Sequence, residues 1–443
     1  CKVTGVQTCA LPILKISELY QVFLKHPVVT TDTRDCPKNS MFFALRGASF
    51  NGNDFAIKAL ESGCAYAVVD DERVVGDERL IHVPNVLTAM QELAAYHRRQ
   101  LHTPILQVTG TNGKTTTKEL TSAVLSERFN VLYTLGNFNN HIGVPKTLLR
   151  LRPEHDIAVV ETGANHPGEI AELSRIVQAD CGLITNVGKA HLEGFGSFEG
   201  VIHTKGELYD DLRQRPDTFI FLNADNEHLV KIAGGLKAVT YGEPGKGYDV
   251  EGEVVSCTPF VNLRWRQKGG EWQEIHTHLI GAYNVTNALA AAAVGLHFGV
   301  SAETITRAIS NYQPTNNRSE LLETGHNTLV VDAYNANPTS MKAAFDSFRL
   351  ISHPKKMAIV GEMRELGAAS EEEHRRVVSE AETLGCDELW FVGNNFKDCA
   401  GAHRFFPDVE AVKKQLEAAP LNGCMVLIKG SNSTRLYQLP EYL

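Results

Sequence analysis

The chain has 443 residues, of which 43% are hydrophobic and 21% are charged. This length exceeds what one hydrophobic core usually holds, so two or three domains are expected. The formal net charge of −9 excludes a broadly basic surface for sequence-independent nucleic-acid binding, but it allows a local basic pocket for a small anionic ligand. The nine cysteines form no CxxC pair, which disfavours a zinc site or a disulfide framework and favours free thiols in a reducing cytosol.

Residues 1–14 are predicted to be non-native or disordered and are left out of the fold prediction, because the start lacks a methionine and its apolar run is too short for a signal peptide. No stretch reaches the roughly 20 apolar residues of a membrane span, so membrane insertion is not expected. A helical pattern from Ile16 is followed by three strand-like runs separated by Gly and Asn turns, at residues 30–34, 41–45 and 65–69. Residues 15–85 are therefore predicted to form a small N-terminal α/β domain.

A central domain is predicted over residues 86–313. It opens with apolar side chains at helical spacing over residues 87–100, and Pro104 precedes the apolar run Ile105–Val108. Further strand-like runs alternate with helical patterns, as a parallel sheet with crossover helices requires; they cover residues 131–134, 157–162, 183–187 and 219–222. Residues 248–279 are instead typical of antiparallel hairpins. Two helices are predicted after them, over residues 284–298 and 302–312.

A C-terminal domain is predicted over residues 314–443, where strands and helices alternate again. The strands are expected at residues 328–332, 356–361, 388–392 and 424–428, and the helices at residues 338–349 and 370–384. This alternation is typical of a doubly wound, Rossmann-like sheet. The predicted fold class is thus α/β with three domains, the central one being a P-loop ATPase domain with a parallel sheet and a short antiparallel part.

Residues 109–118 read TGTNGKTTTK and follow the apolar run, so they predict a nucleotide triphosphate site. A phosphate needs a turn of free backbone N–H groups, a compact cation and a helix N-terminus directed at it. Gly110 and Gly113 would supply backbone freedom, Lys114 the charge, and Thr115 a hydroxyl for a phosphate-bound magnesium. The loop is shorter than the usual GxxxxGK[ST] pattern, because Val108 stands where that pattern has its first glycine.

Three further side chains follow predicted strands or open a helix near this loop. Glu161 ends a strand that should neighbour the loop, where a carboxylate either binds a metal or is simply solvated. His191 lies among glycines just past another strand; a lone histidine is more often structural, but this one would face the same crevice. Lys205 would by itself be an exposed lysine. An ammonium offers only donors, so Lys205 could bind magnesium only if it were carbamylated.

Four residues of the later chain are candidates for nucleotide contacts. Asn284 and Asn287 begin a helix, where they suit capping as well as ligand contact. Arg318 and Asp332 could together close over a nucleotide from the third domain. For the segment after Asp332 the structural alternative is a helix N-terminus capped by Asn337, and this alternative does not exclude a function.

Taken together, six segments resemble the Mur ligase family: TGTNGKTTTK at 109–118, ETGANHPGEI at 161–170, TNVGKAHLEGFGS at 185–197, TKGELYD at 204–210, GAYNVTNALAA at 281–291 and VDAYNANPTSM at 331–341. Six motifs in this order are highly specific, and the resemblance covers about residue 15 to the C-terminus. The YNANP segment, with residues 136–145 and 361–367, is most similar to the D-alanyl-D-alanine-adding branch of the family. The short glycine loop is also the family's form.

The resemblance implies a cytoplasmic bacterial enzyme of peptidoglycan precursor synthesis. A monomer is expected, although the sequence leaves the oligomeric state open. Such an enzyme joins a UDP-N-acetylmuramoyl tripeptide to D-alanyl-D-alanine at the expense of ATP. ATP would phosphorylate the terminal carboxylate of the tripeptide, and the amine of the dipeptide would attack the acyl phosphate. The implied cofactors are two magnesium ions, with a carbamate on Lys205. The third residue of the peptide stays open: diaminopimelate, lysine or another amino acid.

The resemblance also implies roles for individual residues. The catalytic residues would be Lys114, Glu161, His191 and Lys205. The metal ligands would be Thr115, Glu161, His191 and carbamylated Lys205. The ATP site would comprise Gly110, Thr111, Asn112, Gly113, Lys114, Thr115, Thr116, Asn284, Asn287, Arg318 and Asp332. The UDP-substrate site would comprise Thr33, Arg34, Phe43, Arg46, Asn139, Asn140 and Thr162. The D-alanyl-D-alanine side would comprise Tyr334, Asn335 and Asn337. Tyr283 departs from the family, which usually has His there, and this puts the adenine-side contacts in doubt.

Two kinds of alternative remain. Another member of the same superfamily, such as the diaminopimelate- or lysine-adding ligase or a folylpolyglutamate synthase, would differ in the C-terminal domain, where a DNPR-like motif would replace YNANPTS. A P-loop kinase or a non-catalytic ATP-dependent switch is a different class of protein. For that class, Glu161, His191 and Lys205 need not converge on the glycine loop.

Overall fold

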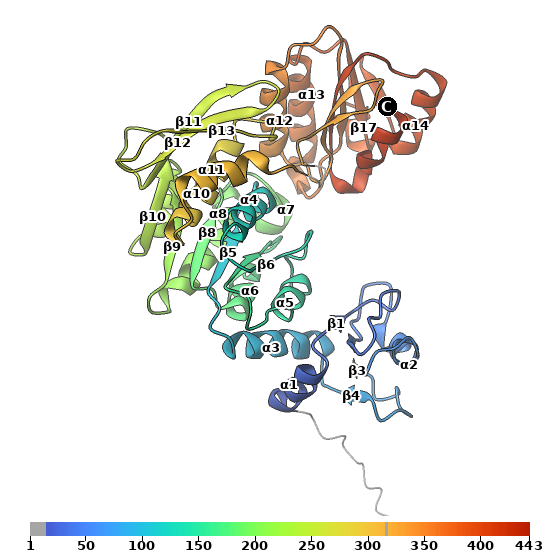
Figure 1. Cartoon of the computed structure of the whole chain (residues 1–443). Coiled ribbons are helices and arrows are strands. Elements are labelled where there is room, and N and C mark those ends of the chain that lie inside the picture. The colour runs from blue at the N-terminus through green and yellow to red at the C-terminus, as the bar shows by residue number, and fades with distance from the viewer. Residues whose placement is uncertain (1–14, 315–317) are drawn as a thin grey trace, which may run out of the picture.

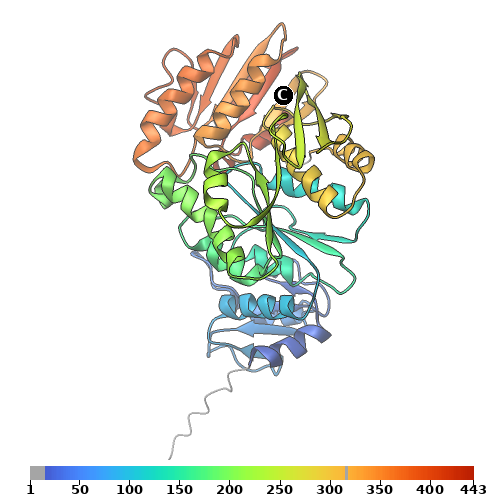
Figure 2. The same cartoon turned by 90° about the vertical axis from the view of Figure 1, so that its left-hand side faces the viewer.

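Three separate β-sheets organise the chain, and each is covered by the helices that connect its strands. The computed structural model describes residues 15–314 and 318–443. The sheets follow one another along the chain, so that the central domain lies between the N-terminal and C-terminal domains (Figure 1, Figure 2). The predicted fold class of three α/β domains is confirmed. None of the helices that the structure describes combines the length and the apolar character that a membrane span requires.

The N-terminal domain contains a four-stranded parallel sheet. Its elements are α1 (Ile16–Lys25), β1 (Val29–Thr30), β2 (Met41–Phe43), α2 (Ala56–Glu61), β3 (Tyr66–Val69) and β4 (Leu80–His82). The strand predicted over residues 30–34 is wrong beyond Thr30, because the Asp32 carboxylate accepts the backbone N–H of Arg34 and turns the chain. The sequence pattern does not predict β4, since its three residues are all half-buried and show no alternation.

The central domain is built on a nine-stranded sheet. Its strands are β5 (Ile105–Thr109), β6 (Val131–Tyr133), β7 (Ile157–Glu161), β8 (Cys181–Ile184), β9 (Phe219–Asn223), β10 (Lys237–Gly242), β11 (Val250–Cys257), β12 (Val261–Gln267) and β13 (Gln273–His276). Its helices are α4 (Lys114–Ser126), α5 (Gly143–Leu148), α6 (Glu169–Val177), α7 (Leu192–Phe195), α8 (Phe198–Arg213), α9 (Glu227–Ala233), α10 (Asn284–His297) and α11 (Ala302–Asn311). The strand order is β13-β12-β11-β10-β9-β8-β5-β7-β6.

Strand β5 leads into the glycine loop and lies between β8 and β7. These strands are parallel, so their carboxyl ends meet at one edge of the sheet, where ligands bind in open α/β folds. The strand predicted over residues 183–187 ends at Ile184 instead, which releases Thr185 and Asn186 from the sheet. The predicted hairpins are confirmed: β11, β12 and β13 pair antiparallel and extend the sheet beyond β10.

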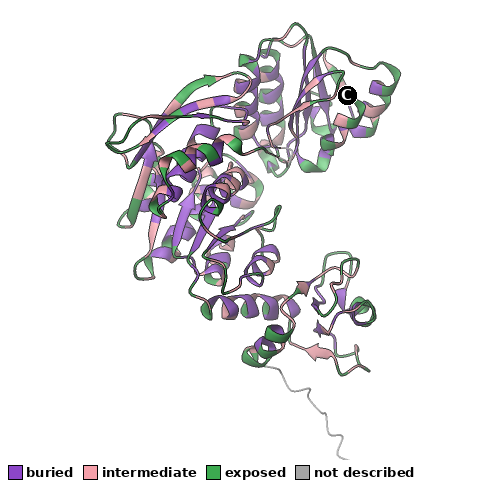
Figure 3. Cartoon of the chain, viewed as in Figure 1, coloured by how far each residue is buried: buried purple, intermediate pink, exposed green. Residues whose placement is uncertain are grey.

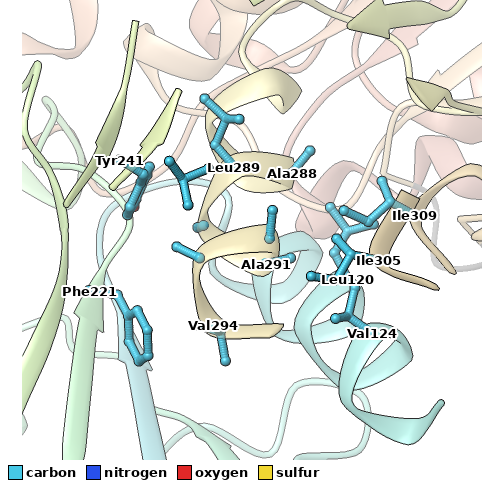
Figure 4. Close-up of a cluster of buried hydrophobic side chains, with 14 of the residues drawn as sticks. Leu120, Val124, Phe221, Tyr241, Ala288, Leu289, Ala291, Val294, Ile305 and Ile309 are labelled. Atoms are coloured by element: carbon cyan, nitrogen blue, oxygen red, sulfur yellow. The ribbon is translucent and has the colours of Figure 1, made fainter. Parts of the chain in front are cut away.

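Helix α10 fills the space between the far half of this sheet and the helix of the glycine loop. Buried residues concentrate along it and along the strands of all three sheets (Figure 3). Its alanines and Leu289 face Phe221 and Tyr241 on one side and α4 and α11 on the other (Figure 4). Gly295 permits the close approach to α4, because a Cβ at that position would lie 2.5 Å from Val124 Cγ1. The packing therefore fixes α4, and with it the glycine loop, against the sheet.

Helix α3 (Val86–Arg99) connects the first two domains and packs on both of them, against α1 on one side and α5 and α6 on the other. It begins where the sequence predicts, because the Asn85 side chain accepts a backbone N–H of the first turn. Its buried side chains share one hydrophobic core with both domains. The domain boundaries at residues 85/86 and 313/314 stay predictions.

The C-terminal domain has a six-stranded sheet of order β14-β15-β19-β16-β17-β18. Its strands are β14 (Glu320–Glu323), β15 (Thr328–Asp332), β16 (Lys356–Gly361), β17 (Glu388–Val392), β18 (Arg404–Phe406) and β19 (Met425–Lys429). Its helices are α12 (Pro338–Leu350), α13 (Ser370–Glu382) and α14 (Val409–Ala418). Only β14 is antiparallel among these strands, so the doubly wound prediction is confirmed. The sequence pattern misses β14, β18 and α14.

A buried histidine in α3 makes the joint between the first two domains sensitive to pH. The Tyr20 hydroxyl lies 3.2 Å from His97 Nδ1, and His97 Nε2 lies 2.9 Å from the carbonyl oxygen of Leu151. These partners suit a neutral ring that accepts at Nδ1 and donates at Nε2. Burial lowers the pKa of His97. The folded state therefore disfavours the proton that the unfolded chain takes up.

Stability contributed by neutral His97 is fully present above the unfolded pKa, near 6.5, and is lost as the pH falls below it, by up to about 1.4 kcal/mol per pH unit. The free energy of unfolding, measured with denaturant, should therefore fall more steeply between pH 7.5 and pH 5.5 for the wild type than for His97→Gln. The exposed neighbour variant His102→Gln serves as the control and should keep the wild-type slope. Equal slopes for the wild type and His97→Gln would contradict this account.

Candidate functional site

The glycine loop connects β5 to α4 at the carboxyl edge of the central sheet. Gly110 has φ +138° and Gly113 has φ +77°, both in the region that side chains rarely adopt. A Cβ on Gly110 would lie 2.1 Å from Thr185 Oγ1, and a Cβ on Gly113 would lie 2.7 Å from Asn287 Oδ1. Both glycines are thus required by backbone conformation and by close approach. Gly113 precedes the first turn of α4, whose N-terminus faces outward from the sheet edge.

Asn186 occupies the hydrogen-bonding groups of the loop. The backbone N–H of Thr111 donates to the Asn186 carbonyl oxygen (2.9 Å), and the backbone N–H of Asn112 donates to Asn186 Oδ1 (3.0 Å). The Asn186 side chain in turn donates to the Asn112 carbonyl oxygen (2.9 Å). Sequence reasoning did not single out Asn186, although it lies inside the TNVGKAH segment. Its position just past the end of β8, which is adjacent to β5, was the available signal.

Lys114 and Glu161 lie side by side at the start of α4 and the end of β7. Lys114 Nζ donates to the carbonyl oxygens of Gly110 and Thr111, each at 2.9 Å. Burial lowers the pKa of Lys114 to about 8, although nearby Glu161 opposes the shift. Glu161 is completely buried, and its Oε1 accepts from Thr115 Oγ1 (3.2 Å) and Asn139 Nδ2 (2.8 Å). The alternative of a solvated carboxylate at this strand end is therefore wrong.

Lys205 is buried on α8 rather than exposed, so the default expectation for an isolated lysine is also wrong. Its side chain is 2% exposed, and Nζ lies 3.4 Å from the carbonyl oxygen of Ala164 and 5.1 Å from the centre of the Phe195 ring. Burial, together with the smaller effect of the nearby Lys114 charge, lowers the pKa of Lys205 to about 7. A substantial fraction of this amine is therefore neutral near pH 7.

His191 lies between the central and C-terminal domains in a left-handed conformation, with φ +49°. Its Nδ1 contacts a carboxylate oxygen of Glu365 in the C-terminal domain. Glu365 lies in the segment 361–367 that carries the family resemblance, but the sequence pattern did not predict a role for it. Burial lowers the pKa of His191, Glu365 opposes this shift, and the charges of Lys114 and Lys205 reinforce it. His191, Lys114 and Lys205 thus lie within electrostatic reach of one another.

A large cavity of about 830 Å³ opens at this cluster. Lys114, Asn139, Glu161 and His191 line it, and so does Ala164, behind which Lys205 is buried. Lys114 and His191 therefore line the same cavity as the Glu161 carboxylate, and Lys205 is buried within electrostatic reach of both. The arrangement suits a ligand with several negative charges and an accompanying cation.

The Glu161 carboxylate is suited to a magnesium ion. Glu161 Oε2 is buried and has no hydrogen-bond partner within the described residues, which fits a carboxylate that awaits a cation. Among the residues that the structure describes, no three His, Cys, Asp or Glu side chains come together in a way that could hold a metal ion. Glu161 therefore needs ligands of other kinds, and the adjacent Thr115 hydroxyl is one of them.

A small cavity of about 260 Å³ lies on the other side of the glycine loop. Its walls include Asn112, Gly113, Thr116, Tyr283, Asn284, Asn287, Arg318, Asp332 and Asn335. The capping prediction for Asn284 and Asn287 is wrong, since the N-cap of α10 is Tyr283 and makes no side-chain cap bond. Asn287 instead accepts from Thr117 Oγ1 (3.1 Å) and donates to Asn284 Oδ1 (2.8 Å).

The C-terminal domain closes this cavity through several contacts. The Tyr283 hydroxyl lies 2.5 Å from Ser319 Oγ, and the Arg318 guanidinium lies 3.8 Å from the centre of the Tyr334 ring. Asp332 forms an ion pair with buried Lys429 (3.0 Å). Arg318 lines both cavities, whereas Asp332 lines the small one. These two predicted closure residues therefore both line the small cavity beside the glycine loop.

The three residues predicted for the dipeptide side lie at the same domain contact. Asn337 caps α12, as the structural alternative predicted, since its side chain accepts the backbone N–H of Ser340 (2.8 Å). It also donates to Asn112 Oδ1 in the glycine loop (2.9 Å). Tyr334 and Asn335 line the large cavity.

The residues predicted for the UDP substrate do not form one cluster. Asn139 and Asn140 line the large cavity. Arg34 is exposed and paired with Asp32, while Arg46 is paired with Asp70 on the N-terminal domain. Thr33 lies on the turn beside Arg34. Phe43 and Thr162 are completely buried, so their side chains hold the fold and are closed to a ligand in this structure. The side-chain contacts expected of these two residues therefore need correction: Phe43 is an apolar strand residue in the core, and Thr162, just past β7, accepts a hydrogen bond from Gln107 Nε2 (3.0 Å).

Comparisons with known proteins agree with this geometry. Residues 27–103, 108–295 and 317–432 match the models described as the Mur ligase family catalytic domain, the Mur ligase middle domain and the Mur ligase glutamate ligase domain. The UDP-N-acetylmuramoyl-tripeptide--D-alanyl-D-alanine ligase of Escherichia coli K12 is 35% identical over 94% of this chain and 93% of its own length. The enzyme of that name from Bacillus subtilis 168 is 38% identical over 78% of this chain and 76% of its own length.

A solved structure extends the likeness to three dimensions. The crystal structure I of MurF from Acinetobacter baumannii superposes with a TM-score of 0.84 at 30% sequence identity, covering 96% of this chain and 97% of the other. The match spans all three domains, including the C-terminal domain, which contributes Arg318 and Asn337. The chain therefore belongs to the Mur ligase family.

Proposed function

We propose that this Mur ligase family member joins UDP-N-acetylmuramoyl tripeptide to D-alanyl-D-alanine at the expense of ATP, with release of ADP and phosphate. Relatives that bear this activity in their names match almost the full length of the chain. The observation that carries the proposal is the convergence of Lys114, Glu161, His191 and buried Lys205 beside one large cavity. We further propose a cytoplasmic monomer, since ATP and UDP-linked precursors are cytosolic substrates.

The first step transfers the γ-phosphoryl group of ATP to the terminal carboxylate of the tripeptide, which is otherwise a poor electrophile. The glycine loop and the N-terminus of α4 would hold the phosphates, and Lys114 would neutralise charge that spreads over the transferred group. For this, Asn186 would release the N–H groups that it holds, and Lys114 would leave the loop carbonyl oxygens. The adenine would occupy the small cavity beside Asn284 and Asn287.

In the second step the free amine of D-alanyl-D-alanine attacks the acyl phosphate, and phosphate leaves from a tetrahedral intermediate. Water must be excluded, because it would hydrolyse the acyl phosphate. The contacts from Asn337 to Asn112 and from His191 to Glu365 close the central domain against the C-terminal domain. We assign the dipeptide to this interface, near Tyr334 and Asn335.

Two magnesium ions and a carbamate on Lys205 complete the proposal. Thr115, Glu161, His191 and carbamylated Lys205 would hold the ions, which would offset the negative charge of the phosphates when bound. The unpartnered Oε2 of Glu161 supports the metal assignment. The lowered pKa of Lys205 supports the carbamate, since only a neutral amine combines with carbon dioxide. A P-loop kinase or an ATP-dependent switch would have no need for this convergence.

The proposal is tested by incubating the purified protein with ATP, magnesium, UDP-muramoyl tripeptide and D-alanyl-D-alanine. Phosphate release should depend on both peptide substrates, and the product mass should equal that of the tripeptide plus the dipeptide less one water. Reactions with diaminopimelate, lysine or glutamate in place of the dipeptide separate the related ligases. Phosphate release without addition of the dipeptide would refute the assignment.

Lys205→Ala should lower kcat by about 100-fold, because it removes the carbamate that would help to hold the metal ions, and several kcal/mol of transition-state stabilisation depend on them. Acetate or propionate should restore part of the activity by replacing the missing carboxylate. Lys231→Ala on α9 replaces an exposed lysine that forms no ion pair with any residue that the structure describes, and it should neither lose activity nor respond to the acids. Full activity of Lys205→Ala would exclude the carbamate role.

Gly110→Ala should lower kcat/KM for ATP at least about 10-fold, since strain at this φ alone costs of order 1–3 kcal/mol and the new Cβ meets Thr185. Steady-state rates at varied ATP concentration measure the effect. Gly269→Ala is the control, because Gly269 also has a positive φ (+74°) but would meet no atom within 4 Å. A Gly110→Ala enzyme with the ATP kinetics of the control would show that the close approach is dispensable.

A further inference from the structure

The large cavity extends from the reacting groups to a wall formed by two helices. Lys114 and Glu161 lie at one end, and the other end is lined by one face each of α3 and α6. We call this second end the α3–α6 wall; its residues are Leu87, Thr88, Gln91, Glu92, Ala95, Glu169, Glu172, Leu173, Arg175 and Ile176. The activity described above uses none of these side chains.

The charged groups of this wall differ in whether the protein already satisfies them. Glu169 accepts the backbone N–H groups of Asn165 and His166, so its carboxylate is committed to the fold. Glu92, Glu172 and Arg175 are exposed to the cavity, and none of them takes part in an ion pair within residues 15–314 and 318–443. The wall therefore presents two carboxylates and one guanidinium that can pair with a ligand; His141 also lines the cavity, and His166 Nδ1 contacts Glu169 Oε1 (3.3 Å).

Geometry places Glu172 and Arg175 as a pair. They are three residues apart on α6, so they project from the same face, with about 4.5 Å of helix rise between them. Leu173, Ile176 and Leu87 add apolar surface to the same wall. The complementary ligand has a short aliphatic chain that ends in both an ammonium and a carboxylate.

The third residue of the peptide is the part of the substrate that must lie here, because its carboxylate is the group that reacts beside Lys114 and Glu161. We propose that the α3–α6 wall binds the side chain of this residue, and that Glu172 with Arg175 selects 2,6-diaminopimelate over lysine. A diaminopimelate side chain brings an ammonium to Glu172 and a carboxylate to Arg175. A lysine side chain would leave Arg175 unpaired. The inference rests on the proposed function, since it concerns the tripeptide of that reaction.

The test compares kcat/KM for UDP-muramoyl tripeptides that carry either meso-diaminopimelate or L-lysine, at saturating ATP and D-alanyl-D-alanine. The wild type should prefer diaminopimelate by about 10-fold or more, since a site that pairs with a polar group discriminates against a substrate lacking it. Arg175→Gln should lose that preference, with a lower kcat/KM for the diaminopimelate substrate and an unchanged value for the lysine substrate. Glu172→Gln should lower kcat/KM for both substrates, because both side chains carry the ammonium group.

Arg99→Gln, which replaces an exposed arginine of α3 outside the wall, is the matched control and should keep the wild-type preference. Equal use of both substrates by the wild type would overturn the inference. An equal loss on both substrates in Arg175→Gln would overturn it too, because Arg175 would then bind a carboxylate that the two peptides share. In either case ligation itself persists and the proposed function stands. Absence of product from both peptides would refute that function and this inference with it.

Discussion

The packing of α10 against α4 is the constraint on which the rest of the site depends. Helix α4 carries the glycine loop at its N-terminus, and its direction decides where the loop's N–H groups and Lys114 point. Gly295 and the neighbouring alanines let α10 approach closely, while Phe221 and Tyr241 hold its other side on the sheet. Because a packed core has few alternative arrangements, the loop is held in a single position beside β7 and β8.

The charges of the site follow from this placement. Glu161 at the end of β7 lies within electrostatic reach of Lys114, which in turn lies near Lys205 and His191. Burial disfavours the charged form of both lysines and is the main reason for their lowered pKa values; the charge of Arg318 near Lys114 and that of Lys114 near Lys205 add to it. Under the proposed function, a bound triphosphate with its metal ions would relieve this repulsion and stabilise the protein at this point. The positive groups that repel one another in the protein alone are the same groups that would attract the phosphates of a nucleotide.

The site is also shared between domains. Asn112 in the loop meets Asn337 at the start of α12, and His191 meets Glu365 beyond β16. Each pair joins a central-domain loop to a C-terminal-domain loop at the carboxyl ends of two different sheets. Neither sheet alone would enclose the acceptor carboxylate, the phosphates and an attacking amine. Under the proposed function, this domain contact would supply the exclusion of water that an acyl phosphate requires.

How far prediction from sequence succeeded depends on the range of the interactions involved. The strands at 157–161 and 356–361 and the loop at 109–118 were predictable, because apolar runs and glycine spacing are local properties. Short elements such as β4 and β18 were not, since three residues carry too little pattern. Asn284 and Asn287 looked like caps, but α10 is buried on all sides and turns their amides to each other and to Thr117.

By itself, the sequence determined the fold class, the family resemblance and the identity of the phosphate loop, because each depends on the order and spacing of residues that are close together in the chain. The tertiary structure alone decided that Lys205 is buried, that Glu161 keeps one oxygen unpartnered, that Asn186 fills the loop and that Glu365 reaches His191. Burial and pairing depend on residues far apart in the chain. They become defined only when three sheets bring their ends together.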